Sequence, residues 1–177
     1  KGEIRFGMGG LKGVGENAIE NIIIERRKRG GFKDIFEFIT RVNQRAVNKK
    51  SIECLAYAGA FDCFPQFHRA QYFHIPDGDR TTGIEKIIGY GQTKDSLTSG
   101  TTNTLFGDLQ QVMEIPPPKI PNCEVWTLTE QLEHEKEITG IFMSGHPLDH
   151  FKFELTYYKI MPLNDFIEIK ESATLSQ

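Results

Sequence analysis

Residues 8–23 constrain the fold more than any other stretch, because glycines there separate two apolar patterns. The string reads Met8-Gly9-Gly10-Leu11-Lys12-Gly13-Val14-Gly15 and continues as Glu16-Asn17-Ala18-Ile19-Glu20-Asn21-Ile22-Ile23. Two glycines enclose Val14, and isoleucines at helical spacing follow them. Glycine permits a tight turn and the close approach of another backbone. The pattern predicts two helices joined by a tight turn, with Val14 and Ile22 buried between them and the second helix over 16–29.

Such a helix–hairpin–helix turn provides an anion site. The N–H groups of the turn and of the first helical turn lack partners within the helix, and they lie at its positive end. A DNA phosphate fits there and is recognised by charge and shape rather than by base identity. The candidate DNA-binding residues are Lys12, Gly13, Val14, Gly15 and Glu16, and the basic surface continues over Arg26, Arg27, Lys28 and Arg29.

Two other interpretations of the glycines stay open. One is a glycine-rich turn between helices that binds nothing. The other is a dinucleotide fingerprint, since Gly7-x-Gly9 and Gly13-x-Gly15 are present. That fingerprint requires a preceding strand and a βαβ frame, and the sequence shows neither.

A second helix–hairpin–helix unit is predicted over 34–58. Val42 and Val47 take the apolar positions of its turn, Asn48 is the expected N-cap of a helix over 48–58, and Gly59 is its expected stop. Three basic side chains in or just after the turn either contact phosphate or form an ordinary solvated helix face: Arg45, Lys49 and Lys50.

The charge distribution agrees with a nucleic-acid partner for the first third of the chain. Residues 1–50 hold 12 Lys and Arg against 6 Asp and Glu, so their net charge is +6. Residues 51–177 hold 9 against 18, which gives −9. The three cysteines form no disulfide framework, which favours a reducing, cytoplasmic location. The longest apolar run is five residues, over 54–58, so no membrane partner is expected.

The predicted fold class is mainly α, with four stretches along the chain. They are a tandem helix–hairpin–helix region (1–75), a loop or linker (76–126), a helical segment (127–160) and a connection (161–177). Residues 77–122 are predicted to be loose because they contain turn-prone residues and four prolines. A long helix is predicted over 127–143, capped by Thr127 and ended by Gly145 and Pro147.

No catalytic or metal-binding constellation emerges from the remaining residues. Cys63, His68 and His74 have poor spacing for zinc. His146, beside Gly145 and Pro147, is interpreted as structural. An acidic helical face interpreted as solvated is formed by Glu130, Glu133, Glu135 and Glu137.

Taken in order, several strings resemble one family, the alpha (polymerase) subunit of bacterial DNA polymerase III. They are IRFGMGGLKGVGENAIENIIIERR, GGFKDIFEFITRV, NKKSIECLAYAGAFDCF, HRAQ, LFG, EKE and SGHPLD. The resemblance covers about residues 4–165. It implies a piece excised from a DNA-directed DNA polymerase, located after the fingers and before an OB-fold domain. The family's catalytic aspartates lie upstream, so no catalytic residue, cofactor or metal is assigned to this chain, and magnesium is expected for the parent polymerase.

The resemblance also implies partners. In this family the helix–hairpin–helix elements grip duplex DNA (the primer-template) behind the active site, and a short peptide binds the sliding clamp. The matching peptide is Thr102-Asn103-Thr104-Leu105-Phe106, with Thr102 where the family prefers Gln. Other polymerase III holoenzyme subunits are expected partners. Two alternatives remain: Leu105 and Phe106 pack onto their own domain, or the chain is a free-standing DNA-binding module of a repair or recombination protein.

Overall fold

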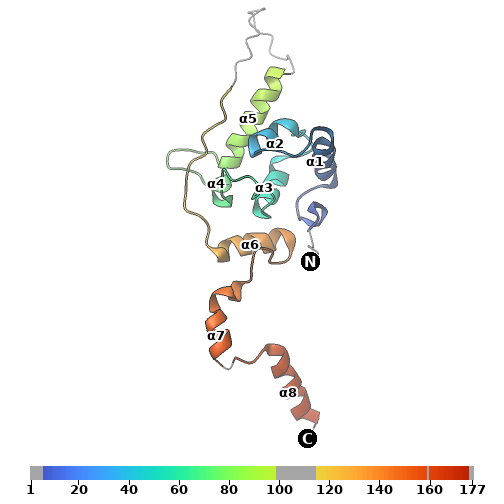
Figure 1. The fold of residues 1–177 in the computed structure, drawn as a ribbon, viewed down its shortest axis with the longest axis vertical. Helices are drawn as coiled ribbons and strands as arrows, with labels where there is room; N and C mark the ends of the chain where they lie inside the picture. Colours follow the sequence, from blue (N-terminus) through green and yellow to red (C-terminus); the bar gives the residue numbers. More distant parts are fainter. Residues whose placement is uncertain (1–5, 99–114, 159, 176–177) are drawn as a thin grey trace, which may run out of the picture. The chain divides into compact units, whose positions relative to one another are not determined.

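Helices are the only regular elements in the part of the chain that the computed structural model describes, which is residues 6–98, 115–158 and 160–175 (Figure 1). This confirms the predicted mainly α class. The chain forms two compact units, the first from Lys1 to Met143 and the second from Ser144 to Gln177. Among the described helices, none combines the length and the apolar character that a membrane span requires.

The first hairpin joins the 3-10 helix η1 (Met8–Gly10) to α1 (Glu16–Arg29) through the turn at residues 11–15. Helix α1 has the predicted bounds, and it ends at Gly30 with φ +80°. Val14 and Ile22 are 8% and 5% exposed, so the prediction that they are buried is confirmed.

The second hairpin joins α2 (Ile35–Arg41) to α3 (Lys49–Tyr57), and Figure 1 shows both beside α1. The side chain of Asn48 accepts a hydrogen bond from the Ser51 N–H at 2.9 Å, as expected of an N-cap. Val42 and Val47 are buried in the turn. The second pair of helices thus follows the first directly along the chain.

The region predicted as a loop contains a helix, so that prediction is wrong. After the short α4 (Arg69–Phe73), helix α5 spans Gly83–Thr98 and packs against α2. Its buried face includes Ile84, Ile87 and Tyr90, and the Tyr90 ring lies 5.5 Å from that of Phe36. Two glycines of α5 lie where another part of the chain comes close, since a Cβ at Gly91 would overlap the side chain of Gln44 and a Cβ at Gly83 would overlap the Gln71 carbonyl.

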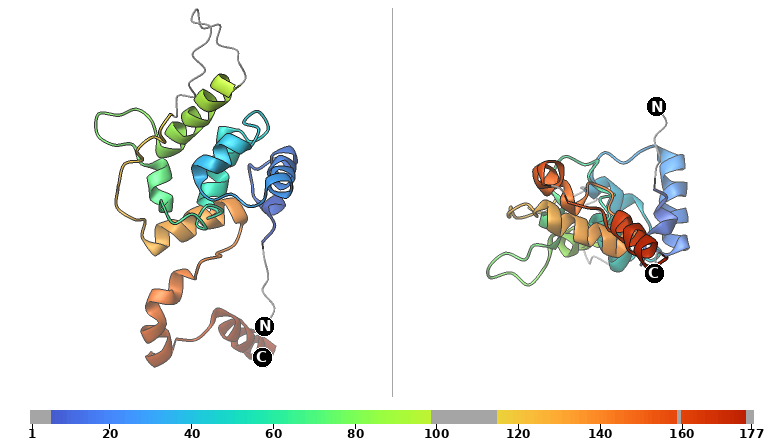
Figure 2. Two further views of the ribbon diagram at one scale, coloured as in Figure 1. Left: turned by 45° about the horizontal axis from the view of Figure 1, so that its top comes forward. Right: turned by 90° about the horizontal axis from the view of Figure 1, so that it is seen from below.

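Helix α6 (Leu128–Thr139) lies against α3, as Figures 1 and 2 both show. The predicted cap is confirmed, because Thr127 and Glu130 form a capping box. The predicted end near 143 is wrong. Gly140 adopts the left-handed conformation at φ +82° and ends the helix first.

The second unit consists of η2 (Pro147–Phe151), α7 (Lys152–Tyr157) and α8 (Leu163–Leu175). Helix α8 occupies most of the predicted connection. His146 has a structural role, as interpreted from the sequence: its Nδ1 accepts from the Leu148 N–H at 3.1 Å, and its own N–H donates to Asp149 at 2.7 Å.

Candidate nucleic-acid interface

The N-terminus of α1 offers unbonded backbone N–H groups, as the sequence predicted. Among the described residues, no acceptor lies at the N–H groups of Gly13, Gly15 and Glu16. The Lys12 N–H differs, because it donates to the Ile138 carbonyl of α6 at 2.9 Å. The available donors are therefore those at the end of the turn and the start of α1, where the helix dipole favours an anion.

The two glycines of the turn have different roles. Gly13 has φ +82°, and a Cβ there would lie 2.7 Å from the Sγ of Cys54 on α3. The close approach at Gly13 is thus made by the protein itself. Gly15 has ordinary extended dihedrals, and a Cβ there would have no atom within 4 Å. Only Gly15 leaves open space for a partner from outside.

Two exposed lysines flank the junction of the turn and α1 at Gly15 and Glu16, which we call the phosphate corner. Lys12 belongs to the turn, and Lys50 reaches it from α3, with its Cε 3.5 Å from the position of a Cβ at Gly13. The structure thereby joins candidates from both predicted hairpins. Glu16 is exposed at the first position of α1, so its carboxylate lies at the edge of the same site. The last turn of α1 carries the exposed Arg26, Arg27, Lys28 and Arg29.

In the second hairpin, Arg45 joins Lys50 as a basic side chain that is exposed and makes no ion pair among the described residues. Its N–H donates to Asn43 Oδ1 at 2.9 Å, which fixes the turn. Lys49 lies at the start of α3, and its Nζ is 2.7 Å from Glu85 of α5 and 3.7 Å from Glu53. The hydrogen bond to Glu85 raises the pKa of Lys49. Lys49 therefore connects α3 to α5 in this structure.

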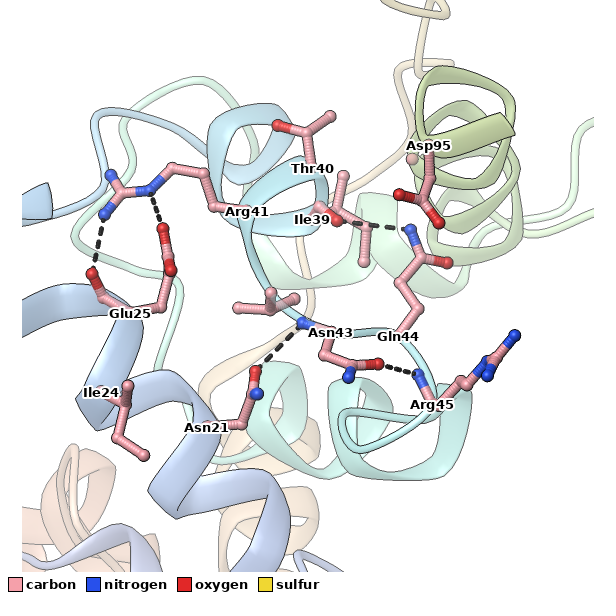
Figure 3. A pocket seen from close by; sticks show the side chains of 12 residues that line it. Asn21, Ile24, Glu25, Ile39, Thr40, Arg41, Asn43, Gln44, Arg45 and Asp95 are labelled. Atoms are coloured by element: carbon pink, nitrogen blue, oxygen red, sulfur yellow. Dashed lines mark hydrogen bonds and ion pairs between the residues drawn. The ribbon is translucent and has the colours of Figure 1, made fainter. Parts of the chain in front are cut away.

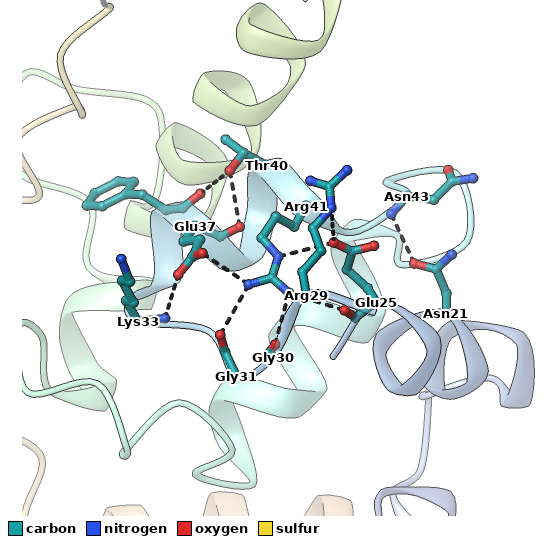
Figure 4. A network of polar contacts seen from close by, with 11 residues as sticks. Asn21, Glu25, Arg29, Gly30, Gly31, Lys33, Glu37, Thr40, Arg41 and Asn43 are labelled. Atoms are coloured by element: carbon teal, nitrogen blue, oxygen red, sulfur yellow. Dashed lines mark hydrogen bonds and ion pairs between the residues drawn. The ribbon is translucent and has the colours of Figure 1, made fainter. Parts of the chain in front are cut away.

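Arg41 anchors the end of α1, a role that the sequence analysis missed (Figure 4). Its Nη2 donates to the carbonyls of Gly30 at 2.9 Å and Glu25 at 3.2 Å, and its Nε donates to the Glu25 carboxylate at 3.1 Å. Its Nη1 donates to Glu37 at 3.0 Å. A guanidinium among carbonyls at a helix C-terminus complements the helix dipole. No local spacing signals this contact, since Gly30 and Arg41 belong to different hairpins.

A cavity of about 470 Å³ lies between α1, the second turn and α5 (Figure 3). Asn21 on its wall accepts a hydrogen bond from the Asn43 N–H at 3.0 Å. The lining carries both Arg45 and Asp95, so its charge is mixed and does not select an anion. Within the described ranges, no group of three or more His, Cys, Asp or Glu side chains could hold a metal ion.

Glu135 is fully buried, so its interpretation as part of a solvated acidic face is wrong. Its carboxylate accepts from Arg69 Nη1 at 2.6 Å and from the Met143 N–H at 3.1 Å. Arg69 also donates to Asp62 at 2.9 Å. Burial alone would lower the pKa of Arg69, but the hydrogen bonds to Asp62 and Glu135 outweigh it and raise that pKa.

The predicted clamp peptide, Thr102 to Phe106, lies outside the described residues.

Comparisons with known proteins agree with these observations. A family model described as a helix-hairpin-helix motif matches residues 1–72. The DNA polymerase III subunit alpha of Vibrio cholerae is 33% identical over 176 residues, which are 99% of this chain and 14% of that protein. The proteins of the same name from Campylobacter jejuni and Pseudomonas fluorescens are 30% and 32% identical, each over 99% of this chain and over 14% and 16% of their own length.

The chain thus spans about a seventh of the length of the curated relatives that it matches. The matches extend beyond the two hairpins and through almost all of the sequence. This chain belongs to the DNA polymerase III alpha-subunit family, and it corresponds to the segment that carries the helix–hairpin–helix motif.

Proposed function

We propose that this chain is a duplex-DNA-binding segment of a replicative DNA polymerase and that it contributes no catalytic residue. The observation that carries the proposal is the open corner at Gly15 and Glu16, where backbone N–H groups at the positive end of α1 lie between Lys12 and Lys50. A phosphate at this corner would meet helix-end donors and two flexible cations. Base edges play no part, so binding is independent of DNA sequence.

The second hairpin supplies a further phosphate contact through Arg45, whose side chain is exposed. Lys50 supports the first corner. Lys49 contributes less, because Glu85 and Glu53 already neutralise much of its charge. We therefore assign the main contacts to Lys12, Gly15, Lys50 and Arg45, with Val14 shaping the turn from its buried position.

The longer protein, on this proposal, is a cytoplasmic DNA-directed DNA polymerase that uses magnesium, and no residue of this chain is assigned to that metal. Its partners are primer-template DNA, the sliding clamp and the other holoenzyme subunits. Residues 102–106 form the clamp-binding peptide. The relatives' names and their match over 99% of the chain favour this function over a free-standing repair or recombination module.

The DNA proposal is tested with Gly15→Val and a matched control, Gly31→Val. Both glycines have ordinary φ and open space at the Cβ position, so neither substitution strains the fold. Gly15→Val places two methyl groups in the proposed phosphate site. It should weaken binding of a fluorescein-labelled duplex about tenfold or more in an anisotropy titration, the loss of one charge-assisted contact, whereas Gly31→Val should bind like the parent. Equal affinity of the two variants would contradict the assignment.

Salt provides an independent measure of the contacts. The logarithm of the association constant should fall linearly with the logarithm of salt concentration, by about 0.9 per phosphate neutralised. Lys12→Ala should reduce that slope by about 0.9. Binding that is insensitive to salt would exclude a phosphate-based interface.

The clamp proposal has its own test. Leu105→Ala combined with Phe106→Ala should remove heat of binding to the purified sliding clamp in calorimetry and leave duplex binding intact. Thr102→Gln should strengthen clamp binding, because a Gln amide both donates and accepts hydrogen bonds. If the double alanine variant binds the clamp as the parent does, the site lies elsewhere.

A further inference from the structure

We propose that helix α6 positions the glycine hairpin for DNA, and that Glu135 is a positioning residue for that interaction. The inference rests on the proposed DNA-binding function. It adds a residue 119 positions after the candidate phosphate site at Glu16 to the determinants of binding.

The contact that carries the inference is the hydrogen bond from the Lys12 N–H to the Ile138 carbonyl, at 2.9 Å. Ile138 lies in the last turn of α6, where carbonyls have no partner within the helix. The hairpin amide therefore caps α6, and α6 in turn fixes the amide beside the phosphate corner. Within the described ranges, this is the one backbone hydrogen bond between the turn at residues 11–15 and an element outside its own hairpin.

The turn is held from two sides. On one side Gly13 rests against Cys54 of α3, and on the other Lys12 bonds to α6. The Cys54 side chain leaves no room for a Cβ at Gly13, but this contact is not directional. The Lys12 bond requires one orientation of the peptide, so α6 determines which way the neighbouring N–H groups of Gly13 and Gly15 point.

A buried ion pair fixes α6 itself. Glu135 and Leu132 are 0% and 1% exposed, and the Glu135 carboxylate bonds both Arg69 at 2.6 Å and the Met143 N–H at 3.1 Å. Arg69 is held in turn by Asp62. Gly59, with φ +77°, leaves the space that the guanidinium fills, since a Cβ there would overlap it.

Such a pair specifies position more than it adds stability. Removing two charges from water costs about as much as their attraction returns, and an apolar contact could replace them. An apolar contact tolerates sliding along the helix, whereas a carboxylate bonded at both oxygens does not. Because Glu135 fixes the position of α6, the Ile138 carbonyl, about one helical turn later, is held in a single position beside the hairpin.

Two pairs of variants of the full 177-residue chain test the inference. Gly140→Val strains the left-handed end of α6, whereas Gly140→Asn, its control, tolerates that conformation, and the Cβ of each has open space. Glu135→Gln removes the buried charge. Its control, Glu133→Gln, makes the same change on an exposed position of the same helix.

The readouts are the exchange rate of the Lys12 amide, measured by NMR, and the affinity for a labelled duplex. Gly140→Val and Glu135→Gln should speed Lys12 exchange at least tenfold and weaken duplex binding at least threefold, while the Ile22 amide in α1 stays protected. Both controls should match the parent in exchange and bind DNA at least as well. If Glu135 only stabilised the fold as a whole, its replacement would also speed exchange of the Ile22 amide. Continued protection of Ile22 therefore separates positioning of the hairpin from general stability.

The possible failures are distinguishable. If the parent chain binds no duplex, the proposed function fails, and Lys12 exchange still decides whether α6 positions the hairpin. If Lys12 exchange is unchanged in Gly140→Val, or if it rises while duplex affinity stays at the parent value, the inference is overturned and the proposed function stands.

Discussion

Replacing Gly13 with alanine should destabilise the fold, because the turn and α3 leave no room for a side chain. The residue has φ +82°, and its Cβ would lie 2.7 Å from the Cys54 Sγ, where ordinary contacts begin at 3.4 Å. The left-handed conformation costs an alanine about 1 kcal/mol. Forcing an atom into a packed contact adds about 1–3 kcal/mol. Urea unfolding should therefore show a loss of about 2–4 kcal/mol in the free energy of unfolding.

A second substitution separates the two contributions. Cys54→Ala removes the Sγ and leaves the Cys54 Cβ at 4.0 Å, an ordinary contact. Alone it should cost about 1 kcal/mol for the small cavity. Combined with Gly13→Ala it should recover the overlap part, so the double variant should be about 1–3 kcal/mol more stable than the sum of the single effects predicts. If the losses of free energy of unfolding from Gly13→Ala and Cys54→Ala simply added, the Cys54 Sγ would not be the reason why position 13 needs a glycine.

Three further predictions concern other elements. Gly89→Ala should raise the free energy of unfolding by about 0.5–1 kcal/mol in a urea titration, since Gly89 lies inside α5 with open space at its Cβ position; a loss would contradict the position of α5. Arg41→Lys should cost about 2–4 kcal/mol by thermal or urea unfolding, because an ammonium cannot reach both the Gly30 carbonyl and the carboxylates. The hydrogen bond from Lys49 lowers the pKa of Glu85. The stabilisation that this ionised carboxylate provides is therefore present above the ordinary carboxyl range and is lost as pH falls through the pKa of Glu85 in the folded protein. The difference in free energy of unfolding between the parent and Glu85→Gln should shrink on acidification, and a constant difference would exclude this contribution.

The helices that the sequence located carry their signals locally. Asn48 and Thr127 are N-caps with the expected bonds, and the glycine-framed Val14 predicts its own burial. Helix α5 lies between the turn-prone residues 77–80 and the prolines at 116–121, and those flanking signals outweigh its own capping box in a prediction from composition. The Thr82 N–H donates to Glu85 at 2.7 Å, and this Thr-x-x-Glu pattern was readable in the sequence.

The candidate interface could be predicted in part for the same reason. Lys12 and Gly15 belong to one short motif, so their spacing is informative. The pairing of Arg69 with Glu135 joins residues 66 positions apart, and no helical or hairpin period links them. The early end of α6 was likewise unpredicted, because Gly140, Gly145 and Pro147 are all plausible stops and packing decides among them.

The buried ion pair has a consequence for moving the hairpins into another protein. The helix–hairpin–helix match ends at residue 72, yet the core that supports the hairpins includes Ile84 and Ile87 of α5, and Leu132 of α6 is buried as well. A graft that stops at residue 75 would carry every residue of the motif and leave Arg69 without Glu135, the partner that lies 2.6 Å from it. The face of α2 that α5 covers would also meet water. The smallest transplantable piece therefore extends to Met143, about twice the length of the motif.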